Sequence, residues 1–230
     1  MNLRNLVIIG TSHIAKESVE RILAAFEKHD VGVVGVELDP ARLSALLSGK
    51  RQHIRLRDIR HVGFKGYLFA ILGQWAEHKL GERVGMKPGD DMLAAVRAAS
   101  ERKIPIALID QDIDQTLKEF SRHLTWTEKW RFVVDIAKAA FGPPQHIPFD
   151  LRTVPDPALV SKLTRQVRKR YPNVYKVLVT DRNEHMARRL YAIMTHEHEK
   201  TILAVVGAGH EEEIVRLLKQ MDKTAQSHKH

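Results

Sequence analysis

Two histidines stand in the same local pattern near opposite ends of the chain. The first closes the segment Gly10-Thr-Ser-His13, and the second closes Gly207-Ala-Gly-His210. Glu37 directly follows another apolar run, so two imidazoles and one carboxylate form a candidate site. Neutral imidazole and carboxylate favour first-row divalent metals, and a set of two His and one Glu leaves coordination positions open for water and substrate. This pattern predicts hydrolytic chemistry, because an open metal lowers the pKa of bound water toward ~7 and polarises a carbonyl oxygen.

The hydrophobic pattern around these residues predicts the elements that position them. Each histidine lies between a continuous apolar run and an amphipathic segment: residues 6–9 and 14–26 for His13, residues 202–206 and 211–221 for His210. Continuous β-branched runs are typical of strands that are covered on both faces of a sheet. A glycine at the strand end permits the sharp turn into a helix. We therefore expect both Gly-x-x-His elements, and Glu37 after a strand at residues 31–36, at the carboxyl edge of one sheet, where open α/β sheets hold ligands.

Further segments accompany the histidine elements along nearly the whole chain. In chain order they are Val36-Glu37-Leu38-Asp39 with Arg42-Leu43, Lys87-Pro88-Gly89-Asp90-Asp91-Met92, Leu108-Ile109-Asp110-Gln111-Asp112-Ile113, and Val177-Leu178-Val179-Thr180-Asp181-Arg182-Asn183. In this order and spacing the chain resembles the TraB/PrgY family, which includes bacterial pheromone-shutdown proteins and the animal Tiki proteases. The resemblance places Arg182 in the family's recurrent acidic-Arg element.

The resemblance implies a metal-dependent hydrolase, most simply a peptidase, with a divalent transition metal such as Mn, Co or Zn. His13, Glu37 and His210 are the expected metal ligands or catalytic groups, and Arg182 is the expected electrostatic stabiliser. The alternative is a non-catalytic protein that binds or sequesters a pheromone-like peptide, because peptidase activity is implied only by the Tiki relatives. A third class, a structural domain that organises a membrane or an assembly, would not depend on the histidines.

Each candidate also has a purely structural interpretation. Either Gly-x-x-His element alone is compatible with a tight turn in which the histidine caps or packs. Arg182 could stabilise an oxyanion or clamp a peptide carboxylate, but it could equally pair with Glu37 or Asp39 and order the sheet edge. Asp110 and Asp112 follow a predicted strand at residues 104–109 and could reach the same edge as Glu37, but helix capping is the favoured interpretation for both.

We predict one α/β domain over residues 1–222 with a central mixed sheet flanked by helices, a helical insert at about residues 114–170, and a polar tail at residues 223–230. The chain has 230 residues and is 43% hydrophobic, which suffices for one sizeable core. It contains no cysteine, which excludes disulfides, thiolate metal ligands and thiol nucleophiles. Within the insert, the pattern over residues 114–141 predicts one long helix.

The net charge of +9 gathers in two basic clusters, within residues 50–65 and 165–176. Few aromatic residues are interleaved with them, so we expect no nucleic-acid partner and favour solvated faces. No apolar run approaches ~18 residues and no signal-peptide pattern is present. The expected location is the cytoplasm. Relatives that carry a membrane segment, which this chain lacks, would lie at the inner face of the membrane. Large apolar residues at 65–79 and 124–141 predict a homodimer, or alternatively a second layer of core.

Overall fold

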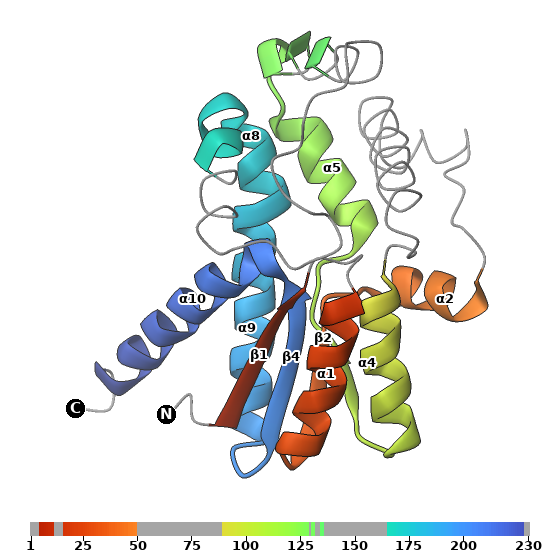
Figure 1. Ribbon diagram of the computed structural model, residues 1–230. Helices are drawn as coiled ribbons and strands as arrows, with labels where there is room; N and C mark the ends of the chain where they lie inside the picture. Colours follow the sequence, from red (N-terminus) through yellow and green to blue (C-terminus); the bar gives the residue numbers. More distant parts are fainter. Residues whose placement is uncertain are drawn as a thin grey trace.

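The computed structural model contains one sheet with helices on both faces (Figure 1). It describes residues 5–11, 16–49, 89–128, 130–131, 134–135 and 165–227. The described strands are β1 (Leu6–Thr11), β2 (Val31–Val36), β3 (Ile106–Leu108) and β4 (Thr201–Gly207). Their order across the sheet is β1-β4-β2-β3, so the last strand in the chain lies between the first two.

All neighbouring strands in the described sheet run parallel. The α/β class is confirmed, but the prediction of a mixed sheet is wrong for the described strands. The physical reason is that each described connection contains a helix, which returns the chain to the edge where the preceding strand began. The carboxyl ends of the strands consequently meet at one edge, where Thr11 of β1 pairs with Gly207 of β4.

Both faces of the sheet carry an apolar layer, which explains why the strands read as continuous hydrophobic runs. On one face, α1 (Lys16–Lys28) and α4 (Asp90–Glu101) cover Val34, Val36, Leu203 and Val205. On the other face, α9 (Asp181–His196) and α10 (Ala208–Ser227) cover Val33, Ile202, Ala204 and Val206. Helix α2 (Pro40–Ser48) follows β2 and begins at the carboxyl edge.

A separate helical group lies beyond the carboxyl edge of the sheet (Figure 1). It contains α5 (Ile113–His123), α8 (Pro172–Tyr175) and the π-helical turn η3 (Lys176–Thr180), which runs directly into α9. A third apolar cluster joins these elements through Phe120, Leu124, Tyr171, Val174 and Val177.

The predicted long helix over residues 114–141 is wrong in its first half. Helix α5 ends at His123, and the backbone of Leu124 is extended before the chain becomes helical again. The side chain of Glu128 accepts hydrogen bonds from the Thr125 backbone N–H and hydroxyl, which starts a new helix there. The apolar segment at 65–79 lies outside the described residues. In the described part of the chain no helix is long and apolar enough to cross a bilayer.

Candidate functional site

The carboxyl edge of the sheet gathers polar side chains from three strand ends. Glu37 directly follows β2, Asp110 follows β3 by two residues, and His210 lies in the first turn of α10, which continues β4 without a loop. Glu37 is buried, with 4% of its surface exposed, and the Asp110 carboxylate is fully buried. Because the strands are parallel, residues far apart in the chain meet here.

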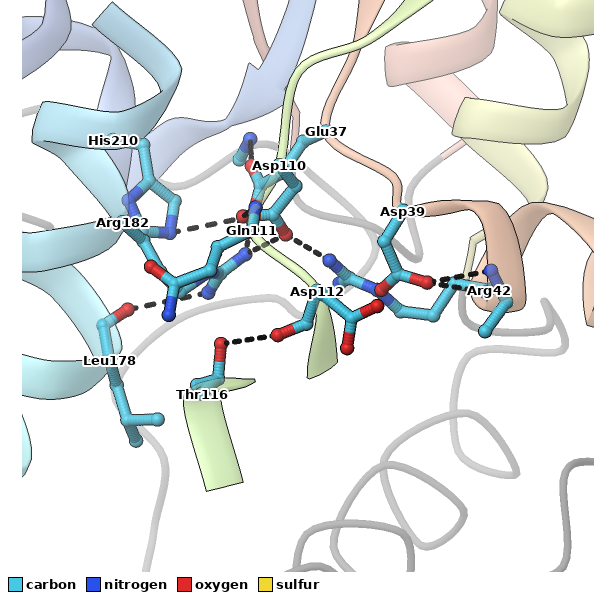
Figure 2. Close-up of polar contacts among 12 residues, drawn as sticks. Glu37, Asp39, Arg42, Asp110, Gln111, Asp112, Thr116, Leu178, Arg182 and His210 are labelled. Atoms are coloured by element: carbon cyan, nitrogen blue, oxygen red, sulfur yellow. Dashed lines mark hydrogen bonds and ion pairs between the residues drawn. The ribbon is translucent and has the colours of Figure 1, made fainter. Parts of the chain in front are cut away.

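Arg182 connects two of these carboxylates (Figure 2). Its Nη2 lies 2.5 Å from Glu37 Oε1 and 2.6 Å from Asp110 Oδ2, and its Nε donates to Asp110 Oδ1 at 3.0 Å. Burial disfavours the guanidinium cation, but the charges of Glu37 and Asp110 outweigh that effect and raise the Arg182 pKa above its usual range. Arg182 therefore remains a fixed positive charge in the centre of the cluster.

The π-helical turn η3 sets the position of Arg182 at the start of α9. The guanidinium Nη1 donates to the backbone carbonyl of Leu178 within η3 at 3.3 Å. A π-helical turn inserts one residue, which rotates the following side chains by about 100° relative to an uninterrupted α-helix. Such turns are frequent at functional sites, and this one aims the first residues of α9 at the sheet edge.

Asp110 is shared between Arg182 and a second arginine, Arg42 (Figure 2). Asp39 caps α2 by accepting from the backbone N–H groups of Ala41 and Arg42 at 2.8 and 2.9 Å. The other oxygen of Asp39 accepts a hydrogen bond from Arg42 Nε at 2.7 Å, and Arg42 Nη2 donates to Asp110 Oδ2. Burial raises the pKa of Asp110, but the two guanidinium groups more than offset this and hold its pKa below the usual range.

His210 and Gly207 complete the surroundings of Glu37. The backbone N–H of Gly207 donates to Glu37 Oε2 at 2.6 Å. His210 Nε2 lies 3.5 Å from Glu37 Oε1, and its Nδ1 lies 2.6 Å from Asn183 Oδ1. In this cluster the carboxylates of Glu37, Asp39 and Asp110 face the guanidinium groups of Arg42 and Arg182, and His210 lies beside Glu37.

The donor set partly fits the metal that the sequence predicts. His210 Nε2 and Glu37 Oε1 are 3.5 Å apart, close to the ~3.4 Å that separates two ligands each ~2.1 Å from one tetrahedral ion. Among the described residues no group of three or more His, Asp or Glu side chains is placed to hold a metal ion. The third predicted ligand, His13, lies outside the described residues, so its contribution stays a prediction.

The structure thus brings Glu37, Arg182 and His210 together. The salt bridge considered for Arg182 exists, but its second partner is Asp110 rather than Asp39. Asp112 caps α5 as expected, since its carboxylate accepts from the Asp114 N–H at 2.8 Å.

Three members of the cluster were not among the predicted site residues. A place at the sheet edge was the less favoured interpretation of Asp110, although it follows a strand at the same edge as Glu37. Arg42 follows the α2 cap by three residues, a spacing that places its side chain back at the edge. Asn183 carries no signal of its own, because its partner His210 is 27 residues away.

Comparison with known proteins places the chain in a family. Residues 2–227 match the TraB/PrgY/gumN family, and the chain belongs to it. The chain is also 32% identical over 226 residues to an uncharacterized protein of Methanocaldococcus jannaschii. That alignment covers 96% of this chain and 55% of the relative, so the chain spans about half the length of the relative that it matches.

Proposed function

We propose that this member of the TraB/PrgY/gumN family is a metal-dependent hydrolase that acts on a peptide. The observation that carries the proposal is the approach of His210 Nε2 to Glu37 Oε1, at 3.5 Å, beside the cation of Arg182. This pair lies at the carboxyl edge of a parallel sheet, the usual ligand-binding edge of such folds. The peptide substrate rests on the likeness to Tiki proteases, and a cytoplasmic location is part of the same proposal.

Each residue of the cluster has a distinct task in this proposal. Glu37 and His210, together with His13, would hold the metal, which would supply the Lewis acidity that activates water near neutral pH and polarises a carbonyl oxygen. Arg182 orients Glu37, because its Nη2 donates to Glu37 Oε1 at 2.5 Å. The Gly207 N–H holds the other Glu37 oxygen and so fixes the plane of the carboxylate.

Thermal unfolding with added metal tests the proposal without knowledge of the substrate. Protein purified without chelator is analysed for bound metal and melted with Mn, Co or Zn. A ligand that binds only the folded state at a hundred times its dissociation constant adds about 2.7 kcal/mol to the free energy of unfolding. We expect a higher Tm and faster peptide hydrolysis for the native protein, and loss of both effects in His13→Ala and in His210→Ala.

The control is the double variant His196→Ala/His198→Ala, which removes two exposed histidines at the end of α9. It should keep the full metal response, because these side chains lie at the opposite end of α9 from Arg182 and Asn183. If no metal changes the melting curve of the native protein at neutral pH, the metal-dependent hydrolase is rejected.

The second candidate is a non-catalytic protein that binds or sequesters a peptide. It is favoured by the hydrogen bonds at both Glu37 oxygens, one of which accepts from Arg182 and the other from Gly207. Peptide binding measured beside turnover separates the two candidates. Loss of turnover with unchanged peptide affinity in His210→Ala supports the hydrolase, whereas peptide affinity without any turnover in the native protein supports the binding protein.

A further inference from the structure

Adjacent residues at the start of α9 contact Glu37 and His210, two of the three predicted metal ligands. Arg182 bonds Glu37, and Asn183, the next residue, bonds the ring of His210. Asn183 Oδ1 lies 2.6 Å from His210 Nδ1, and Asn183 is buried, with 1% of its surface exposed. A single turn of one helix therefore holds both Glu37 and His210.

We infer that Asn183 is a positioning residue that determines which ring nitrogen of His210 carries the proton. A carboxamide oxygen only accepts hydrogen bonds, so the nitrogen opposite it, Nδ1, must carry the hydrogen. The neutral ring then leaves the Nε2 lone pair directed toward Glu37 Oε1. The role of this tautomer in metal binding rests on the proposed function, in which Nε2 binds the metal. The tautomer itself does not depend on that function.

The amide nitrogen of Asn183 indicates that the Asn183 side chain is oriented toward His210 for the site rather than for folding. Asn183 Nδ2 is buried and has no hydrogen-bond partner among the described residues. A buried donor without a partner lowers stability. An asparagine retained only for packing would bring no benefit here over an apolar side chain of similar volume, whereas a carbonyl oxygen opposite Nδ1 is the usual means of orienting a ligating imidazole.

Nitrogen NMR of the histidine rings tests this inference directly. Full-length protein labelled with ¹⁵N-histidine is studied in the presence of a chelator at a pH where His210 is neutral, and the His210 signals are those lost in His210→Ala. The native ring should be protonated at Nδ1. In Asn183→Leu the acceptor is gone, so the ring should change to the Nε2–H form, whose hydrogen faces Glu37 Oε1.

Asn183→Asp is the matched variant that keeps an acceptor oxygen at the same place. It should keep Nδ1 protonated, and Asn183→Ala replaces the leucine variant if that protein does not fold. Melting curves should show that Asn183→Leu is as stable as the native protein or more so, because the unbonded donor is removed. Metal affinity should fall 10–100-fold in Asn183→Leu, as is usual on loss of an orienting partner, and much less in Asn183→Asp.

The outcomes separate this inference from the proposed function. A native His210 protonated at Nε2, or an unchanged Nδ1–H tautomer in both Asn183→Leu and Asn183→Ala, overturns the role of Asn183. If the tautomer changes as expected but metal has no effect on the native protein, the positioning role stands and the metal-dependent hydrolase fails.

Discussion

Two glutamates with the same burial lie in different regions of the molecule. Glu37 at the sheet edge and Glu128 in the outer helical group are each 4% exposed. The partners of Glu37 are a guanidinium, a backbone N–H and an imidazole, from residues 145 to 173 positions later in the chain. Within the described part of the chain, Glu128 accepts from neutral groups, the backbone and side chain of Thr125 and of Asn173.

The difference shows that burial of a carboxylate does not by itself mark a site. Burial raises the pKa of Glu128, but the hydrogen bonds from Asn173 and Thr125 outweigh it and lower the pKa below its usual value. The bonds from Thr125 start the helix that contains Glu128, and the bonds from Asn173 hold the start of α8. The charge of Glu128 is therefore stabilised by contacts that serve the fold. Glu37 instead shares Arg182 with Asp110 and faces His210, a group that can bind a metal or a proton.

The largest expected effect comes from removing the shared cation. Arg182→Met leaves Glu37 and Asp110 buried without their main partner, which should lower the free energy of unfolding by about 3–5 kcal/mol in urea titrations. The control is Arg216→Met, which breaks an exposed ion pair with Glu213 and should change the free energy of unfolding far less. Equal effects of the two variants would remove the distinction between the sheet edge and an ordinary surface pair.

Replacing each glutamate by glutamine should show which of the two supports metal binding and which supports only folding. Glu128→Gln loses charge-assisted bonds and should destabilise the protein by about 2 kcal/mol while the metal-induced rise in Tm is kept. Glu37→Gln should reduce that metal-induced rise more than it reduces stability. The reverse order, a large loss of stability and an intact metal response in Glu37→Gln, would make Glu37 a structural residue like Glu128.

Acid should weaken both regions, through separable contributions. The pKa of Asp110 and the pKa of Glu128 are lower in the folded protein than in the unfolded chain, where they are about 3.9 and 4.3. Their stabilisation is therefore complete above those unfolded values and is lost as the pH falls through the folded ones. Urea titrations between pH 6 and pH 2 should show that Glu128→Gln removes one part of this loss.

Arg182→Met should remove the other part, because Asp110 then loses a guanidinium that lowers its pKa. An acid profile that is the same in the native protein and in both variants would contradict the assignment of these two carboxylates.

The smallest expected effect on stability concerns the exposed surface of the outer helical group. Trp126 and Trp130 are 77% and 71% exposed and lie four positions apart, which places them on one side of a helix. We propose that they contribute to the predicted homodimer. Trp130→Glu should reduce self-association in light scattering and change the free energy of unfolding by less than about 0.5 kcal/mol. A native protein that is strictly monomeric at high concentration contradicts the dimer.

The sequence predicted the parts of the fold in which local pattern and tertiary burial agree. The apolar runs at β1, β2 and β4 are continuous because both faces are covered, and the helical period at α4 and α9 follows one buried stripe each. The prediction of a mixed sheet was wrong for the described strands, although continuous apolar runs are typical of parallel sheets. The break after α5 had a readable sign, the Thr125-x-x-Glu128 capping box, that the longer helical period obscured.

The candidate site could be predicted only where strand ends mark it. Glu37 and His210 follow apolar runs, and the parallel arrangement brings such positions together. Arg42 and Asn183 lie on helices, and their partners are 68 and 27 residues away. Contacts of this kind depend on how helices pack against the edge, which neither composition nor periodicity records.

The place of β4 in the sheet also determines when the site can exist. Because β4 lies between β1 and β2, no strand joins these two amino-terminal strands until β4 (Thr201–Gly207) is present. During synthesis, Glu37 emerges long before Arg182, Gly207 and His210. In the nascent chain, Glu37 therefore lacks these three partners until the chain has been made as far as β4 and the start of α10.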